Sequence, residues 1–290
     1  MQSRSASSVA THSRTESTRT NVMRGAEHAS TDPFSLVGRF AVVTGGTKGL
    51  GEAIVEALCE RGCRVFTCAR TRSDVEERVR SWRTRGYDVD GCACDVSDAK
   101  ARKTLVEAVR KWSNGTLHAL VNNVGFNNRK PTLEYTSSEY AALMGTNLEA
   151  SFEFCKEFHG MLRASGSGAI VFNSSVSGLT STATGSLYAM SKGAMNQLTR
   201  YLACEWAKDN IRVNAVAPWY IATPLAKQVL KNETYRRAVV DRTPAGRVGE
   251  PPEVGAVAAF LVAPASSYVT GVVIPIDGGF TAHGFIPPKL

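Results

Sequence analysis

Tyr188 and Lys192, within the stretch YAMSK, place a phenol and an ammonium group four residues apart. On a helix, side chains at this spacing lie one turn apart on the same face. A neighbouring ammonium group favours the phenolate over the phenol, so the pair has the composition of a proton-transferring site. A Tyr and a Lys at this spacing are more often a packed ring and a solvated charge, so the meaning of the pair depends on the rest of the chain.

A glycine-rich turn lies early in the chain, in VVTGGTKGLGEAIVEAL. Gly45, Gly49 and Gly51 follow an apolar, strand-like run and precede a helical pattern. Glycines at such a place allow a tight turn and a close approach of the backbone to a pyrophosphate, and the N–H groups of the helix N-terminus attract phosphate. The turn therefore predicts a dinucleotide site.

The end of the second strand-like run indicates which dinucleotide binds. NAD sites carry an acidic residue about 20 residues after the glycines, where it holds the ribose 2′-hydroxyl. No Asp or Glu occurs between Glu60 and Asp74, and the expected position holds Ala69 followed by Arg70. Because an arginine pairs well with a 2′-phosphate, we expect NADP(H). Lys48, in the glycine turn, is either a second phosphate ligand or a solvated loop lysine.

The elements that position these residues alternate regularly from Arg39 onward. The strand-like runs are FAVVT, CRVFTC, VDGCAC, HALVNN, AIVFNS, IRVNAV and GVVIPI. Several of them are apolar on both faces, as buried parallel strands are, and the segments between them are long enough for helical crossovers. The pattern predicts a single doubly wound α/β (Rossmann) domain over residues 34–290. About seven parallel strands flanked by helices are expected, with ligands at the carboxyl ends of the strands.

The composition of the 290-residue chain, with 43% hydrophobic and 21% charged residues, is ordinary for a globular enzyme. The longest clean apolar run, Ala256–Ala263, is much shorter than the roughly 20 residues that span a bilayer, so we expect no membrane contact. Seven scattered cysteines without a CxxC motif and five unclustered histidines predict free thiols in a reducing compartment and no metal site.

The net charge of +8 raises the question of nucleic-acid binding. Six arginines lie between Arg70 and Arg85, but Val75, Val79 and Trp82 recur among them at helical spacing. Most of these arginines therefore belong to the exposed face of an amphipathic helix, and we expect no nucleic-acid partner. A basic surface also attracts phosphorylated small molecules.

Residues 1–33 differ from the rest of the chain. Twelve of their first 31 positions are Ser or Thr, four are Arg, and large apolar residues are few. This composition cannot support a hydrophobic core, and it is typical of a disordered extension or of an organellar transit peptide. We therefore expect a cytoplasmic protein, with a plastid location as the alternative if the segment is a transit peptide.

Over about residues 34–290, the chain resembles the short-chain dehydrogenase/reductase family, because it has several motifs of that family in the family's order. They are TGGTKGLG, the NNVG of residues 122–125, Asn147, Ser175 and YAMSK. The segments LACEWAKDNIRVNAVAP and SSYVTG are most similar to the tropinone-reductase-like branch, which reduces small cyclic or hydrophobic ketones with NADPH.

The resemblance implies a catalytic tetrad of Asn147, Ser175, Tyr188 and Lys192. Tyr188 is the expected general acid, although a free phenol titrates near pH ~10 and needs cationic neighbours to reach a working pKa. Lys192 would supply such a charge and hold the nicotinamide ribose. Ser175 would hydrogen-bond the carbonyl oxygen of the substrate, and Asn147 would anchor a water that resupplies the proton.

The resemblance also implies contacts with the cofactor. Asp95 and the Val96 backbone are expected at the adenine, and Thr223 with the Ile221 backbone at the nicotinamide carboxamide. Asn122 is expected at the adenosine ribose or, alternatively, as a structural turn residue. The full expected set is Gly45, Thr47, Lys48, Gly49, Leu50, Gly51, Arg70, Asp95, Val96, Asn122, Gly125, Tyr188, Lys192, Pro218, Ile221 and Thr223.

The substrate pocket departs from the family pattern after the sixth strand-like run. In APWYIATP, Trp219 and Tyr220 replace small residues, and they either wall the pocket or are buried elsewhere. Residues 176–187 contain no Asp or Glu that would hold an ammonium group, so we expect a largely apolar ketone. The long segment 224–244 suits a mobile lid. The expected pocket residues are Phe126, Ser175, Val176, Leu187, Trp219, Tyr220 and Leu225, with Leu179 and Val229 as further candidates.

The expected activity is the NADPH-dependent reduction of a small, largely apolar, cyclic ketone to a secondary alcohol. A secondary-alcohol dehydrogenase that runs in the oxidative direction is the alternative, and a non-catalytic NADP(H) sensor is a third. The small residues of the helix expected over 187–208, together with the resemblance, imply a homodimer or homotetramer.

Overall fold

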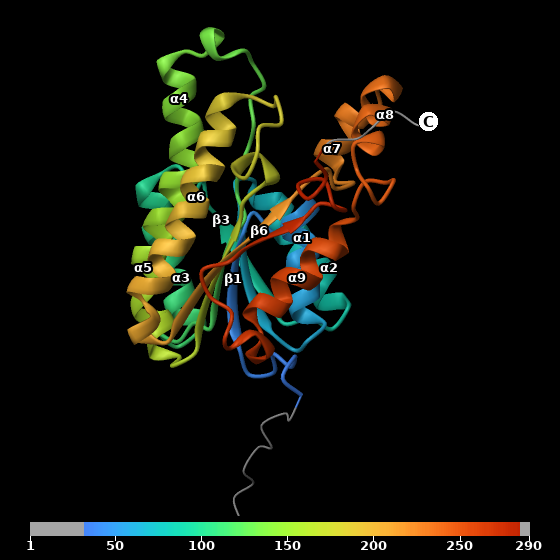
Figure 1. Ribbon diagram of the computed structural model, residues 1–290. Coiled ribbons are helices and arrows are strands. Elements are labelled where there is room, and N and C mark those ends of the chain that lie inside the picture. Colours follow the sequence, from blue (N-terminus) through green and yellow to red (C-terminus); the bar gives the residue numbers. More distant parts are fainter. Residues whose placement is uncertain (1–31, 285–290) are drawn as a thin grey trace, which may run out of the picture. The chain divides into compact units, whose positions relative to one another are not determined.

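A parallel sheet of seven strands forms the centre of the computed structural model, which describes residues 32–284 (Figure 1). The strands are β1 (Phe40–Thr44), β2 (Arg64–Ala69), β3 (Val89–Ala93), β4 (Ala119–Asn122), β5 (Gly168–Asn173), β6 (Ile211–Pro218) and β7 (Val273–Ile276). Their order in the sheet is β3-β2-β1-β4-β5-β6-β7. Each of the seven predicted runs forms a strand, and the predicted doubly wound α/β fold is confirmed.

The direction of winding reverses at β1. The chain places β2 and β3 on one side of β1 and then returns to place β4 to β7 on the other side. All pairs are parallel, so every strand ends at the same edge of the sheet. In a doubly wound sheet the ligand binds outside the carboxyl ends of the strands, at this reversal.

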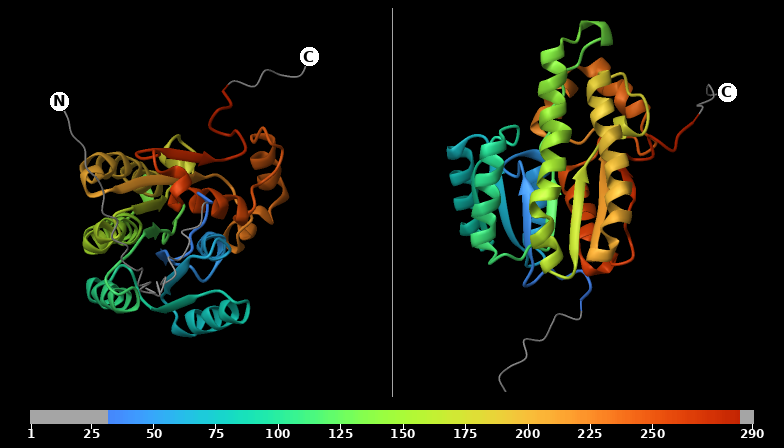
Figure 2. Two further views of the ribbon diagram at one scale, coloured as in Figure 1. Left: turned by 90° about the horizontal axis from the view of Figure 1, so that it is seen from below. Right: turned by 90° about the vertical axis from the view of Figure 1, so that its left-hand side faces the viewer.

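Helices cover both faces of the sheet (Figures 1 and 2). One face carries α1 (Gly49–Cys59), α2 (Arg72–Thr84) and α9 (Pro251–Val262), and the other carries α3 (Ala99–Trp112), α5 (Ala150–Ala164) and α6 (Ser186–Glu205). Three shorter helices lie beyond the carboxyl edge of the strands: α4 (Ser137–Met144), α7 (Pro224–Leu230) and α8 (Glu233–Asp241). The segment predicted as a lid therefore contains α7 and α8.

The hydrophobic core lies on both faces of the sheet because successive strand residues point to opposite sides. In β1, Ala41 and Val43 pack in the layer that contains Ile54 of α1, whereas Val42 packs in the layer that contains Phe158 of α5. Strands buried in this way need apolar residues at nearly every position. This requirement explains why their sequences read as continuous apolar runs.

The arginine-rich segment forms the amphipathic helix α2, as the sequence predicts. Its apolar residues Val75, Val79 and Trp82 are buried. Arg78 reaches across to α1, where it pairs with Glu52 at 2.7 Å. These charges therefore belong to the outer face of a packed helix.

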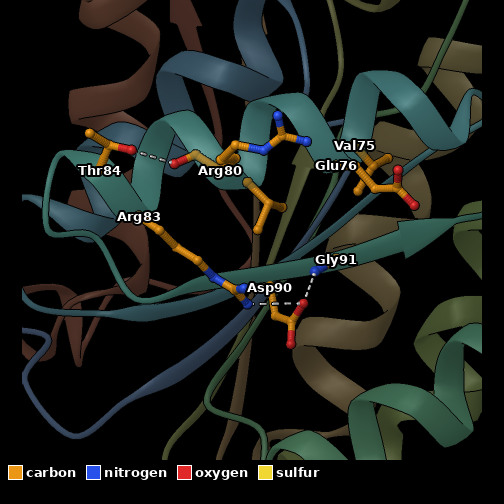
Figure 3. A pocket seen from close by; sticks show the side chains of 8 residues that line it. Val75, Glu76, Arg80, Arg83, Thr84, Asp90 and Gly91 are labelled. Carbon is orange, nitrogen blue, oxygen red and sulfur yellow. Dashed lines mark hydrogen bonds and ion pairs between the residues drawn. The ribbon is translucent and has the colours of Figure 1, made fainter.

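A cavity of about 540 Å³ lies between α2 and the edge strand β3 (Figure 3). Its lining includes Arg83 and Asp90, which pair with each other at 3.3 Å. The cavity opens at the outer edge of the sheet and not at the reversal beside β1. The cavity therefore lies away from the place where ligands bind in doubly wound sheets.

The predicted extension of residues 1–33 lies almost entirely outside the described residues, which begin at Asp32. The carbonyl of Pro33 accepts a 2.8 Å hydrogen bond from the N–H of Ala265, so the chain contacts the folded part from its first described residues. Within residues 32–284, no helix combines the length and the apolar character that a bilayer crossing requires.

Candidate active site

Tyr188 and Lys192 lie one turn apart in the first half of α6. Lys192 is 3% exposed, and its Nζ donates a 2.6 Å hydrogen bond to the backbone carbonyl of Asn173, the last residue of β5. The same Nζ lies 5.6 Å from the centroid of the Tyr188 ring. Lys192 is therefore a fixed, buried cation beside the phenol, and not a solvated surface charge.

Burial changes the proton affinity of both groups in opposite directions. It lowers the pKa of Lys192 to about 8, because the ammonium loses its hydration. It raises the pKa of the Tyr188 phenol, while a hydrogen bond with Ser175 and the positive charge of Arg129 act in the opposite direction. At neutral pH the lysine is therefore charged while the tyrosine keeps its proton, which is the state that a proton donor needs.

Ser175 comes from the segment that follows β5. It begins the short turn η3 (Val176–Gly178), and its Oγ accepts a 3.1 Å hydrogen bond from the N–H of Ser177. The side chain is nearly buried and shares a hydrogen bond with the Tyr188 phenol. The hydroxyl groups of Ser175 and Tyr188 therefore lie together at the end of β5.

Asn147 lies in η2 (Gly145–Glu149), a single turn of π-helix between α4 and α5. It is completely buried. Its Oδ1 accepts from the N–H of Phe126 at 3.0 Å, and its Nδ2 donates to the carbonyl of Phe126 at 2.9 Å. Its Nδ2 also donates to Ser191 Oγ at 3.3 Å. Turns of this kind occur often at functional sites, and this one fixes the loop after β4 against α6.

Gly125 shows how closely the predicted tetrad is assembled. A Cβ placed on Gly125 would lie 3.4 Å from Asn147 Oδ1 and 3.5 Å from Lys192 Nζ. Asn147 and Lys192, from separate helices, therefore both face the backbone of the loop after β4. Together with Ser175 and Tyr188, they are gathered at the carboxyl ends of the central strands.

The glycine turn has the geometry of a phosphate cradle. Gly45 and Gly49 have positive φ angles of 69° and 63°, which glycine adopts without strain. A Cβ on Gly51 would lie 2.2 Å from the carbonyl oxygen of Gly45, so α1 begins in direct contact with the turn. Lys48, at the N-cap, makes no side-chain capping bond, and the N–H of Gly49 hydrogen-bonds with the Glu52 carboxylate. The N-terminus of a helix attracts phosphate. The residues present therefore fit the pyrophosphate of a dinucleotide.

Arg70 and Asp95 follow the neighbouring strands β2 and β3. Arg70 is exposed, and none of the ion pairs within residues 32–284 includes it. Asp95 accepts from the N–H and the hydroxyl of Ser97 at 3.0 and 2.7 Å. These bonds, and the charge of Arg70, lower the pKa of the Asp95 carboxyl. Arg70 therefore offers an open guanidinium where a 2′-phosphate is expected.

Lys48 is neither free nor buried. Its Nζ lies 2.7 Å from Oδ2 of Asp74, in the first turn of α2, and the two side chains are 67% and 33% exposed. A phosphate at Arg70 would compete with Asp74 for this lysine. Such an exposed pair contributes at most about 1 kcal/mol, so the competition is weak.

Two asparagines that the motifs did not single out connect the glycine turn with Lys192. Asn123 Nδ2 donates to the carbonyl of Gly45 at 3.1 Å. Asn173 Nδ2 donates to Asn123 Oδ1 at 2.8 Å, and the Asn173 carbonyl accepts from Lys192. Their positions at the ends of β4 and β5 were the sequence feature that could have identified them.

Asn122 occupies a different environment from Asn123. It is 1% exposed, and its Nδ2 points to the sulfur of Cys155 on α5 at 3.5 Å. Its Oδ1 has no hydrogen-bond partner among residues 32–284. The side chain of Asn122 thus lies below the strand ends, while that of Asn123 contacts the turn.

The segment after β6 completes the cofactor side. Thr223 Oγ1 caps α7 by accepting from the N–H of Ala226 at 3.2 Å. Its side chain would lie 3.5 Å from a Cβ on Gly49, so it borders the glycine turn. Ile221 is buried nearby. The other expected cofactor residues with buried side chains are Thr47 and Val96, whereas Leu50 is partly buried and Pro218 ends β6.

Comparison with known proteins agrees with this geometry. A family model described as Enoyl-(Acyl carrier protein) reductase matches residues 45–281. A tropinone reductase homologue of Arabidopsis thaliana is 52% identical over 252 residues, which is 87% of this chain and 96% of the relative. The chain belongs to the short-chain dehydrogenase/reductase family.

A second plant relative and a solved structure are also similar to this short-chain dehydrogenase/reductase. A tropinone reductase homologue of Datura stramonium is 48% identical over 256 residues, covering 87% of this chain and 96% of the relative. The solved structure of a gluconate 5-dehydrogenase from Burkholderia cenocepacia, in complex with NADP and tartrate, matches with a TM-score of 0.83. That match has 30% identity and covers 87% of this chain and 99% of the other. The protein is a tropinone-reductase-like oxidoreductase.

The expected substrate residues of this short-chain dehydrogenase/reductase fall into two groups. Phe126, Leu179 and Leu225 are 40%, 39% and 68% exposed, and they follow three different strands at the carboxyl edge. Val176 is completely buried and Leu187 nearly so. The three exposed side chains therefore add apolar surface beyond the strand ends, whereas the two buried ones belong to the interior.

Trp219 and Tyr220 directly follow β6, and aromatic contacts fix the orientations of their side chains. The Trp219 ring stacks on Phe280 at 3.8 Å, and its Nε1 donates to Thr243 at 3.2 Å. Tyr220 is 8% exposed, and its hydroxyl shares a 2.5 Å hydrogen bond with that of Tyr235 on α8. Trp219 therefore packs on the C-terminal segment, and Tyr220 holds α8.

Proposed function

We propose that the protein is an NADPH-dependent carbonyl reductase that converts a small, largely apolar, cyclic ketone to a secondary alcohol. One arrangement supports this proposal above all: the protonated Tyr188 phenol hydrogen-bonds with Ser175 and lies beside the buried cation of Lys192. This combination provides a proton donor, an oxygen-binding partner and a compensating charge at one point.

The roles of the four residues follow from their positions. The Tyr188 and Ser175 hydroxyls bind the carbonyl oxygen of the ketone, and Tyr188 transfers its proton to that oxygen as negative charge develops. NADPH, when bound, supplies the hydride. Lys192 stabilises the phenolate that remains on Tyr188. Asn147 holds the loop after β4 next to Lys192 and orders a water through which the proton is replaced.

The cofactor assignment has two independent supports. Arg70 offers an unpaired guanidinium at the end of β2, where an acidic residue would select NAD. The gluconate 5-dehydrogenase that this chain resembles was solved with NADP. NADP(H) is therefore the cofactor that this site would hold.

The substrate class is inferred from the surface around Tyr188. Phe126, Leu179 and Leu225 present apolar surface, as a hydrophobic ring ketone requires. The names of the plant relatives refer to tropinone reductases, which supports a ketone as the oxidised partner. The same residues would also catalyse alcohol oxidation, and an excess of NADPH in the cell favours reduction.

A turnover assay with two variants tests the proposal. NADPH oxidation is followed with cyclic, bicyclic, terpenoid and steroid ketones, for the wild type and for Tyr188→Phe. We expect turnover that falls by about 10²- to 10⁴-fold in Tyr188→Phe, because the phenylalanine ring has no proton to donate. Tight NADPH binding without turnover of any ketone or of the matching alcohols with NADP⁺ would instead indicate a non-catalytic sensor.

We also propose a homo-oligomer built on α5 and α6, which lie side by side in the right-hand view of Figure 2. These helices expose large apolar side chains: Phe152 on α5 is 40% exposed, and Met190 and Tyr201 on α6 are 51% and 65% exposed. Large exposed apolar side chains are typical of an interface between copies.

The protein is also proposed to be cytoplasmic, with the plastid as the alternative location. A fluorescent fusion of the chain, compared with and without residues 1–33, tests the two locations against each other.

A further inference from the structure

Arg129 lies in the loop after β4, and this loop contacts the segment before Tyr188, because Asn127 Nδ2 donates a 2.9 Å hydrogen bond to the carbonyl of Thr184. Its Nη1 donates a 3.3 Å hydrogen bond to the hydroxyl of Tyr235 on α8. Its Cζ lies 5.9 Å from the centroid of the Tyr220 ring, after β6. Two phenols from separate segments therefore hold the guanidinium in place beyond the strand ends.

The charge of Arg129 has no counter-ion in the described part of the chain. None of the ion pairs among residues 32–284 includes Arg129, and its side chain is exposed. The next residue, Lys130, contrasts with it, because Lys130 pairs with Glu139. A guanidinium that is positioned by neutral partners alone keeps its full charge and its remaining N–H donors for another group.

The guanidinium also acts on the reacting residue. The positive charge of Arg129 opposes the effect of burial on the pKa of the Tyr188 phenol. Arg129 and the phenol oxygen therefore share one electrostatic environment. A ketone bound at Tyr188 and Ser175 extends from that oxygen, so its far end lies in the field of Arg129.

We propose that Arg129 is a specificity-determining residue that selects ketones carrying a carboxylate and disfavours ketones carrying an ammonium group. The planar fork of a guanidinium matches a carboxylate, and like charges repel. The apolar surface of Phe126 and Leu225 would contact the ring between the two polar ends. This inference rests on the proposed reductase activity and refines its substrate: a ring ketone with an acidic substituent.

A second role for Arg129 has to be separated from this one. The chain of contacts from Arg129 through Tyr235 to Tyr220 also links the loop after β4 to α8. A purely structural link would affect all substrates alike. Charge selection instead changes the ratio between charged and neutral substrates, so the ratio is the decisive quantity.

The test compares three ring ketones of similar size. They are 4-oxocyclohexanecarboxylate, its methyl ester, and N-methyl-4-piperidone in its protonated form. The kcat/KM values are measured for wild type, Arg129→Gln and Arg129→Lys, with Lys130→Gln as the matched control. For the wild type we expect the acid to be preferred over the ester by about 10-fold or more, the scale of one hydrogen bond to a charged group.

The variants give the diagnostic pattern. In Arg129→Gln the preference for the acid should fall to about one, and the amine should gain relative to the ester. Arg129→Lys should keep part of the preference, and Lys130→Gln should keep all of it. A wild-type acid-to-ester ratio near one, or a ratio that Arg129→Gln leaves unchanged, would overturn the inference.

Calorimetry separates this inference from the proposed function. Binding of the acid and of the ester to the NADPH-loaded protein is measured for wild type and Arg129→Gln. If neither ketone is reduced but the acid binds more tightly in an Arg129-dependent way, the proposed function fails and the charge selection stands. Equal binding of acid and ester to both proteins contradicts the charge selection, whatever the turnover.

Discussion

The ammonium group of Lys192 lies between two other parts of the site: 2.6 Å from the carbonyl of Asn173 and 5.6 Å from the centre of the Tyr188 ring. Burial in this position lowers its pKa to about 8. The cation that supports Tyr188 is therefore close to losing its charge under mildly alkaline conditions. This relationship makes the pH dependence of catalysis a direct probe of the pair.

The first prediction concerns that pH dependence. The charged form of Lys192 is populated below its pKa of about 8 and is lost as the pH rises through that value. The pKa of Tyr188 is raised, so the tyrosine keeps its proton over the same range. We therefore expect kcat/KM for ketone reduction to fall about tenfold per pH unit above pH ~8.

The control for this pH profile is Lys192→Arg, because a guanidinium does not titrate in this range. Whatever activity this variant retains should show no fall near pH ~8. A wild-type profile that stays flat to pH 10 would show that the charge of Lys192 does not govern the reaction.

The second prediction concerns Arg70. Its removal in Arg70→Ala should weaken NADPH binding by about 1.5–3 kcal/mol and leave NADH binding unchanged, because only NADPH carries the 2′-phosphate. Fluorescence titration with both cofactors measures the effect. Arg72→Ala is the matched control, since Arg72 is 81% exposed and lies beside Glu76 on α2. Equal losses for both cofactors would mean that Arg70 does not contact the phosphate.

A third prediction follows from the contact between Gly51 and Gly45. The methyl group of Gly51→Ala would lie 2.2 Å from the Gly45 carbonyl oxygen, so α1 must shift away from the turn. We expect a destabilisation of about 2–3 kcal/mol in urea unfolding, together with weaker cofactor binding. Gly160→Ala on α5 meets no atom within 4 Å and should instead stabilise the protein by about 0.5–1 kcal/mol.

The fourth prediction tests the α5–α6 interface. Tyr201→Glu introduces a charge on the exposed apolar face and should convert the oligomer to smaller species in sedimentation velocity. Arg80→Glu, on the opposite face of the sheet, should leave the sedimentation coefficient unchanged. Dissociation by both variants would point to a general loss of stability, and dissociation by neither would contradict the interface.

The fold was predictable because each of its strands and helices is specified by a short, continuous stretch of the sequence. Each strand is a short apolar run bounded by polar residues, and each crossover between strands is long enough for a helix. Tyr188 and Lys192 could be singled out for the same reason, since they are neighbours on one helix, whereas Asn147 and Ser175 came from the resemblance to the family. The glycine turn likewise lies within one short segment.

The supporting contacts were not predictable because they join distant segments. Asn123 and Asn173 connect two strand ends through a side-chain bond, and no local pattern specifies that partner. The packing of Trp219 depends on Phe280, which returns from the C-terminal segment. The surroundings of Arg129 depend in the same way on Tyr235 in a later helix.

The glycine turn also determines where this protein can be redesigned. A side chain at Gly46 would lie 2.2 Å from Thr67 Oγ1, and one at Gly51 would lie 2.2 Å from the carbonyl oxygen of Gly45, so these two positions leave no room for a larger residue. Most residues that we propose to surround the ketone belong to loops and short helices beyond the strand ends. A mutagenesis library for new substrates should therefore randomise positions in 126–131 and 225–241 and keep the turn, Ile221 and Thr223 constant.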